Sequence, residues 1–158
     1  MIDNQRIKLI MSNELFINRL KEIKEAEKDR QFCGHDMEHF IDVARIAYIL
    51  NLEKGDEIDK DIIYATALLH DIGRGYENHN EKSADLAEVI LKEASFSQID
   101  IDLIKDAILH HRHNDTSDKN LLAEIISKAD RLSRKCYECA CINECYWDDV
   151  DKNKYLKY

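Results

Sequence analysis

The sequence contains no proline and only four glycines among its 158 residues. The strict alternation of apolar and polar residues that is typical of β-strands is nearly absent. Apolar residues instead recur at intervals of three and four, which is the period of an amphipathic helix. The sequence therefore predicts an all-α fold.

Long uninterrupted apolar stretches are also missing. The first twenty residues mix charged with apolar side chains, which fits neither a signal peptide nor a membrane span. We therefore expect a cytoplasmic protein. In that compartment its five cysteines are more often thiols or metal ligands than disulfides. No linker, repeat or low-complexity segment divides the chain, so we expect one domain over residues 1–158.

Positive charge is scarce, with 23 lysines and arginines against 32 aspartates and glutamates and a net charge of −9. Sequence-independent binding of nucleic acid requires a basic surface, so this balance argues against a duplex nucleic acid as partner. Nucleotides are still compatible with it, because a bound metal ion can supply the positive charge locally.

The apolar period predicts six helices and, with weaker support, a seventh over residues 1–11. The six cover about 12–28, 36–53, 59–70, 81–94, 97–110 and 119–134. A cysteine-rich segment, residues 136–158, follows the last of them.

One short stretch, residues 70–75, organises the chain. It begins with His70 and Asp71 directly after an apolar helical run, and Gly73 and Gly75 then let the backbone turn away. Neutral imidazole and ionised carboxylate are the ligands that divalent cations such as zinc and manganese prefer. A buried helix that delivers both groups together predicts part of a metal site.

The same features recur further along the chain. His110 and His111 end a second helix, and Asp130 lies in the middle of a third, one turn from the apolar Ile126. A carboxylate that faces inward there without a partner would cost several kcal/mol or shift its pKa upward. A metal ion removes that cost, so Asp130 is a further candidate ligand.

In order, His39, the His70-Asp71 pair and Asp130 each lie on a different predicted helix. This ordered set, with the motif at residues 35–39 and the following Val43-Ala44, resembles the HD-domain (HDIG-type) superfamily of metal-dependent phosphohydrolases. The resemblance spans about residues 35–135 and implies a bundle of about six to seven helices. It also implies that these four residues ligate a divalent metal.

The remaining histidines are similar to positions that hold a second metal in dinuclear branches of that superfamily. The resemblance thus implies one or two ions (Fe, Mn, Zn, Ni or Mg), bridged by Asp71, with His79, His110 and His111 on the second. Those branches include cyclic-dinucleotide phosphodiesterases, diadenosine-tetraphosphate hydrolases and a few di-iron oxygenases. Arg112 to Asp115 lack the Gly-Tyr-Pro signature of the cyclic-di-GMP enzymes, which argues against that substrate.

The activity implied by the resemblance is hydrolysis of a phosphate ester or anhydride, of a nucleotide, through attack of a metal-bound hydroxide on phosphorus. Arg74 and Lys128 are the candidate cations for the phosphoryl oxygens, beside Asp71 at the metal. A small-molecule phosphate is then the expected partner, without a membrane. Two alternatives use the same ligands: a di-iron oxygenase, and a metal- or nucleotide-binding sensor without turnover.

Four of the five cysteines lie within ten residues of one another: Cys136, Cys139, Cys141 and Cys145. This density is compatible with an additional zinc ion or iron–sulfur cluster. The alternative is a set of thiols that pack as small apolar groups beside neighbouring aromatic residues. The sequence alone leaves both interpretations open.

Overall fold

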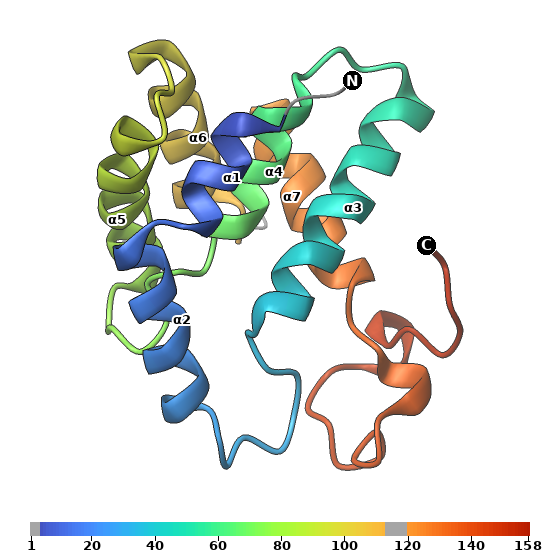
Figure 1. Cartoon of the computed structure of the whole chain (residues 1–158). Coiled ribbons are helices and arrows are strands. Elements are labelled where there is room, and N and C mark those ends of the chain that lie inside the picture. Colours follow the sequence, from blue (N-terminus) through green and yellow to red (C-terminus); the bar gives the residue numbers. More distant parts are fainter. Residues whose placement is uncertain (1–3, 113–119) are drawn as a thin grey trace.

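The computed structural model describes residues 4–112 and 120–158. Over these residues it contains seven α-helices, two short 3-10 helices and no strand, which confirms the predicted all-α fold. The elements are α1 (Gln5–Met11), α2 (Glu14–Ala26), α3 (Met37–Lys54), α4 (Lys60–Leu69), α5 (His79–Glu93), α6 (Gln98–His110), α7 (Leu121–Leu132), η1 (Cys136–Glu138) and η2 (Asp149–Asp151) (Figure 1).

Side-chain caps explain where several helices begin. Asn13, Asp36, Ser97 and Asn120 each precede a helix and accept a hydrogen bond from a backbone N–H of its first turn. Gly55 ends α3 in the left-handed conformation, with φ of 71°. These polar residues set the helix bounds within about two residues of those predicted from the apolar period.

The central helix is α4, whose side chains are buried on nearly every side. Ile62, Ile63 and the residues from Ala65 to Leu69 are all buried. A short helix that is apolar all round must be enclosed by other helices, and α4 contacts α1, α3, α5, α6 and α7. Its carboxyl end, where His70 and Asp71 follow, therefore opens into the interior of the bundle.

Helix α3 packs against both α4 and α7, while α5 and α6 form a pair on the other side of α4 (Figure 1). This arrangement brings the first turn of α3, the end of α4 and the second half of α7 to one side of the molecule. The three predicted ligand segments come from these three places.

The segment after α7 has a different character. It contains only the two single-turn helices η1 and η2, and of the described residues none after Leu132 belongs to the hydrophobic core. Polar contacts hold it instead: the Asn153 amide donates to the carbonyls of Arg131, Leu132 and Arg134 at 2.8, 3.2 and 2.9 Å. These bonds satisfy carbonyls at the end of α7.

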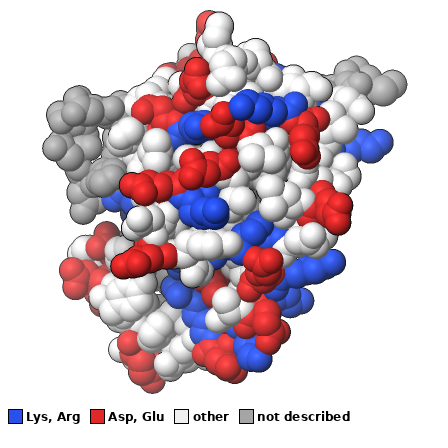
Figure 2. All heavy atoms as spheres, turned by 90° about the vertical axis from the view of Figure 1, so that its left-hand side faces the viewer, with Lys and Arg blue, Asp and Glu red and all other residues white. Residues whose placement is uncertain are grey.

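Acidic and basic side chains are interleaved on the face shown in Figure 2, without a continuous basic area. That distribution agrees with the net charge of −9 in giving a nucleic acid backbone no extended basic surface on this face. Within the described ranges, no helix has the length and apolar character needed to cross a bilayer.

Gly73 tests how tightly the turn after α4 is packed. A Cβ there would lie 2.5 Å from the carbonyl oxygen of His79 and 2.6 Å from the backbone nitrogen of Ser83. We expect Gly73→Ala to lower the free energy of unfolding by about 1–3 kcal/mol, because backbone must move to admit the methyl group. Urea unfolding measures this change.

Gly34→Ala is the matched control. Its added Cβ meets only a carboxylate oxygen of Glu27, at 3.9 Å, which is an ordinary contact. Equal destabilisation by the two substitutions would contradict the tight packing inferred for Gly73.

Candidate metal centre

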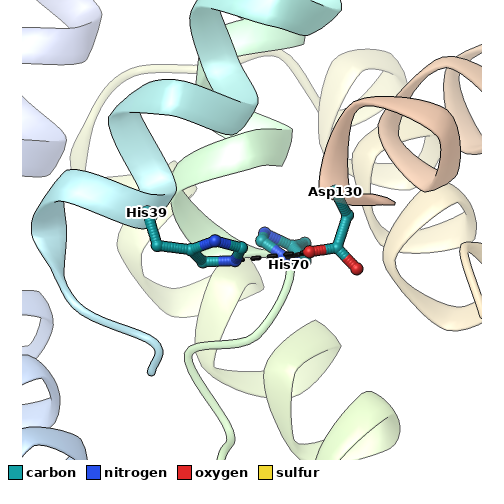
Figure 3. A group of neighbouring side chains, drawn as sticks. All are labelled: His39, His70 and Asp130. Carbon is teal, nitrogen blue, oxygen red and sulfur yellow. Dashed lines mark ion pairs between the residues drawn. The ribbon is translucent and has the colours of Figure 1, made fainter. Parts of the chain in front are cut away.

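Three side chains from three helical segments point toward one another in the bundle. His39 comes from the first turn of α3, His70 follows the last turn of α4, and Asp130 comes from α7 (Figure 3). One ligand atom from each lies within 4.8 Å of the other two. The Nε2 atoms of His39 and His70 are 3.3 and 3.8 Å from Oδ1 of Asp130.

Hydrogen bonds on the other ring nitrogen fix the direction of both imidazoles. Nδ1 of His70 lies 2.7 Å from the carbonyl oxygen of Ala67, which can only accept a hydrogen bond. Nδ1 of His39 lies 3.3 Å from the hydroxyl of Ser133, whose own proton goes to the carbonyl of Asp130. Nδ1 of both rings is therefore a hydrogen-bond donor, and Nε2 of both rings faces Asp130.

This geometry fits a divalent cation. Two ligand atoms on one ion, each about 2.0–2.2 Å from it, lie about 3–3.5 Å apart, close to the separations found here. Nε2 of His39, Nε2 of His70 and Oδ1 of Asp71 are buried and have no hydrogen-bond partner among the described residues. Lone pairs that face one another in a dry site require a proton or a cation between them.

The carboxylate of Asp71 is fully buried and forms a second group with His70 and His111. Burial alone would raise its pKa, but the neighbouring charges, first His70 and then Arg112, hold the pKa well below its ordinary range. Burial would also raise the pKa of Asp130, but the neighbouring His39 and His70 lower that pKa well below its usual value. Both carboxylates are thus ionised and available as ligands at neutral pH.

His111 repeats the orientation of His70 at the end of α6. Its Nδ1 lies 2.7 Å from the carbonyl of Ile108, and its Nε2 is 3.8 Å from Oδ1 of Asp71. Burial and the proximity of His70 lower its pKa to about 4, so the ring is neutral. Nε of Arg112 donates to Nε2 of His111 at 3.2 Å, and Nη2 of Arg112 donates to Asp71 at 2.6 Å.

Arg112 is a functional candidate that sequence reasoning missed. Its guanidinium contacts both Asp71 and His111, on the side of Asp71 where the resemblance places a second metal. Nothing in the spacing of the sequence marks it, because it follows the end of α6 directly and belongs to no motif.

His35 lines the main pocket and also reaches Asp71. Its Nε2 lies 3.4 Å from Oδ2 of Asp71, and its Nδ1 lies 2.9 Å from Oε1 of Glu27. A carboxylate that orients an imidazole toward a metal site is a common supporting arrangement. Glu27 has no sequence signal for this role, since it lies at the end of an amphipathic helix among other charged residues.

The turn that carries Asp71 is held from α2 by a buried arginine. Nε of Arg19 donates to the carbonyl of Ile72 at 3.1 Å, and its Nη2 donates to the carbonyl of Arg74 at 2.7 Å. From the opposite side, the Ser83 hydroxyl accepts from the N–H of Gly73 at 2.9 Å. Nothing in the sequence marks Arg19 for this role, because its contacts are to backbone far along the chain.

The candidate ligands His39, His111 and Asp130 line a pocket of about 710 Å³. His35, His39, His111 and Asp130 form one part of its wall, and Tyr146 and Trp147 form another. Five arginines also line it, although the chain as a whole is acidic: Arg30, Arg74, Arg112, Arg131 and Arg134.

Other predicted site residues lie elsewhere. His79 and His110 line a neighbouring hollow of about 410 Å³, and His110 Nδ1 contacts Asp106. Their role as ligands of a second ion stays a prediction. Arg74 lines the main pocket with its Nε 3.5 Å from Glu27, whereas Lys128 is exposed on α7 and is not in the pocket wall.

Comparison with known proteins identifies the family. The model of the HD domain matches residues 36–135, more than half of the chain. The chain belongs to the HD-domain family. This confirms the resemblance that the ordered ligands predicted, and the match covers His39, the His70-Asp71 pair and Asp130.

The chain is similar to an uncharacterized protein from Clostridium beijerinckii. It is 42% identical over 158 residues, which covers 97% of this chain and 99% of the relative. No solved structure matches the chain significantly. The HD-domain assignment therefore places the chain in a superfamily of metal-dependent hydrolases. The substrate has to be inferred from the residues of the site.

The pair of Glu27 and His35 predicts a pH dependence of stability. Burial would raise the pKa of Glu27, but bonding from His35 outweighs this and lowers the pKa from 4.5 to about 2. Ionised Glu27 therefore stabilises the fold above about pH 4.5, and that contribution is lost as the pH falls toward 2. The stability gap between the wild type and Glu27→Gln should be greatest above pH 4.5 and shrink below it.

Urea unfolding across this pH range measures the gap. Glu25→Gln is the control, because Glu25 is exposed and pairs only with the exposed Lys28 among the described contacts. Exposed pairs contribute little. A gap for Glu27→Gln that does not change with pH would rule out the proposed pairing.

Proposed function

We propose that this HD-domain protein hydrolyses a phosphate ester or anhydride and that its substrate is a nucleotide. The observation that carries the proposal is a metal-ligand set, His39, His70 and Asp130, beside a pocket lined by five arginines. In a chain with a net charge of −9, this concentration of positive charge selects for an anionic ligand. The pocket volume is within the usual range for small-molecule sites.

The arginines suit phosphate in particular. A guanidinium presents several N–H donors in a plane and forms paired hydrogen bonds to phosphate oxygens. Arg112 is held beside Asp71 by its 2.6 Å contact, with 34% of its side chain exposed, so it is both oriented and accessible. We assign to Arg112 the stabilisation of negative charge on a phosphoryl group, with Arg74 as a second cation.

The ligand residues would hold a divalent ion through Nε2 of His39, Nε2 of His70 and the carboxylates of Asp71 and Asp130. Such an ion supplies a Lewis acid and lowers the pKa of a water molecule that it binds. The chain itself holds Nδ1 of both imidazoles by hydrogen bonds, so that Nε2 faces the site, and it keeps both carboxylates ionised. His35, oriented by Glu27, lies 3.4 Å from Oδ2 of Asp71.

Two aromatic rings support a nucleotide over a simple phosphate. Tyr146 and Trp147 line the pocket, with ring centroids 5.5 Å apart and an interplanar angle of 33°. Arg134 lies over the Trp147 ring at 4.3 Å from its centroid. Aromatic faces beside arginines are a suitable surface for a nucleobase attached to phosphate.

Asp71→Asn tests the reaction class. Asparagine keeps the shape of the side chain but removes the charge that a divalent ion requires, so we expect metal-dependent phosphate release to fall to background. The assay compares nucleotides, dinucleotides and simple phosphate esters with Mn²⁺, Fe²⁺ or Zn²⁺. Circular dichroism confirms that the variant is folded.

Together with measurements of oxygen uptake and nucleotide binding, the same assay separates the rival functions. Full phosphohydrolase activity in folded Asp71→Asn protein would disprove the proposal. Oxygen uptake without phosphate release would indicate the di-iron oxygenase, and tight nucleotide binding without any product would indicate the sensor.

Arg112→Ala tests the cationic contact. Loss of one positioned donor to the reacting group typically lowers kcat about 10²–10³-fold, and we expect a decrease in this range. Arg45→Ala, an exposed arginine of α3 outside the pocket wall, is the control and should leave kcat unchanged. An increase in bound metal per chain without loss of kcat in Arg112→Ala would show instead that Arg112 only fills a second metal position.

A further inference from the structure

A second cavity, of about 290 Å³, adjoins the pocket lined by arginines and shares His39 with it. Four cysteines line it: Cys33, Cys136, Cys139 and Cys145. Cys33 comes from the loop between α2 and α3, and the other three come from the segment after α7. Two segments that are distant in sequence thus bring four thiols to one cavity.

The structure distinguishes these four thiols from the fifth. Cys141 lies within the dense part of the cysteine motif, yet it is absent from the cavity wall, and its Sγ accepts from the amide of Gln31 at 3.4 Å. Sequence spacing groups Cys141 with Cys136, Cys139 and Cys145, whereas Cys33 lies far from them in the sequence. Two of the four cysteines in the cavity wall, Cys136 and Cys139, form a Cys-x2-Cys pair, which is common in zinc sites.

Cys33 lies near two of the other thiols of this cavity. Burial raises the pKa of Cys33, and the neighbouring Cys136 and Cys145 raise it further. All five cysteines are free thiols in this structure. Thiols release their protons when they bind a zinc ion, so free thiols that line one cavity are available to a metal.

The segment that carries three of these cysteines has no other strong source of order. Its described residues contribute nothing to the hydrophobic core, and Tyr146, Val150, Tyr155 and Leu156 are largely exposed. Short segments without an apolar core are commonly held by disulfides or by a structural metal. Polar contacts such as those of Asn153 hold its start and its end, while the cysteines lie between them.

We propose that Cys33, Cys136, Cys139 and Cys145 form a four-thiolate site for one structural zinc ion. In the present structure no three of these sulfurs lie within 4.8 Å of one another, since the described groups of that kind consist of His and Asp only. Zinc binding therefore draws the sulfurs together across the cavity. The loop at Cys33 and the segment after η1 lie outside regular helices, so they can close without disturbing the bundle.

Such an ion would connect the parts of the chain that hold the catalytic metal ligands. Cys33 lies six residues before His39, and Cys136 lies six residues after Asp130. His39 and Cys33 line both cavities. The thiolate site would thus join the start of α3 to the end of α7, across the same seam that the contact between His39 and Ser133 spans.

Metal analysis of full-length protein, purified without oxygen or chelators, tests the proposal. The His70→Ala background removes a ligand of the His/Asp centre, so zinc that remains is bound elsewhere. We expect about one zinc per chain in His70→Ala. Adding Cys33→Ser or Cys139→Ser should remove this zinc, whereas adding Cys141→Ser, the matched control, should leave it in place.

Cobalt substitution gives a readout that does not depend on the folding of any variant. Cobalt bound by thiolates produces sulfur-to-metal charge-transfer absorption in the near ultraviolet, which the His/Asp centre cannot produce because it contains no sulfur. We expect this absorption in the wild type and in Cys141→Ser. Its absence from cobalt-loaded wild-type protein would overturn the proposal.

Three further results would also overturn it. Equal loss of zinc from Cys141→Ser and Cys33→Ser would mean that the cavity does not define the ligand set. Iron with acid-labile sulfide in the His70→Ala protein would replace zinc by an iron–sulfur cluster. Thiols that become titratable only after reduction would show that the cysteines form disulfides instead.

Discussion

The central constraint on this structure is the ionised carboxylate of Asp71, which has no exposed surface. A buried charge of this kind is tolerated only when opposite charge and hydrogen-bond donors surround it. The chain supplies these groups from different elements: His70 from the end of α4, Arg112 from the end of α6, and His35 from the loop before α3. The packing of three helix ends against one another is therefore coupled to the charge of one residue.

The chain uses one local device repeatedly to direct its imidazoles. His70 and His111 each place Nδ1 2.7 Å from the carbonyl three residues earlier. The bond satisfies a carbonyl that lacks a helical partner at the end of a helix and fixes the tautomer at the same time. A histidine at a helix end is thus prepared for ligation by the helix itself, before any metal is bound.

The local rules account for what sequence analysis could and could not predict. The apolar period and the capping residues predicted the helices, and the order of His39, His70-Asp71 and Asp130 predicted the family. Both signals can be read directly from the order of residues along the chain. Arg112, Glu27 and Arg19 were missed because each acts across a tertiary contact: Arg19, for example, bonds to carbonyls more than fifty residues away. Cys33 is far from the other cysteines in the sequence, and the fold brings it to the same cavity.

The charge of the chain illustrates the same distinction between composition and placement. A net charge of −9 disfavours anionic partners when it is averaged over the surface, yet five arginines line one pocket. Two nearby acidic groups are paired, because Asp71 pairs with Arg112 and Glu27 lies beside His35 and Arg74. Asp130, a candidate metal ligand, and Asp151 also line the pocket. In the proposed function, a phosphate in this pocket would meet the guanidinium groups. The ligand class is therefore determined by which charges face the pocket, and the overall balance determines only what the rest of the surface repels.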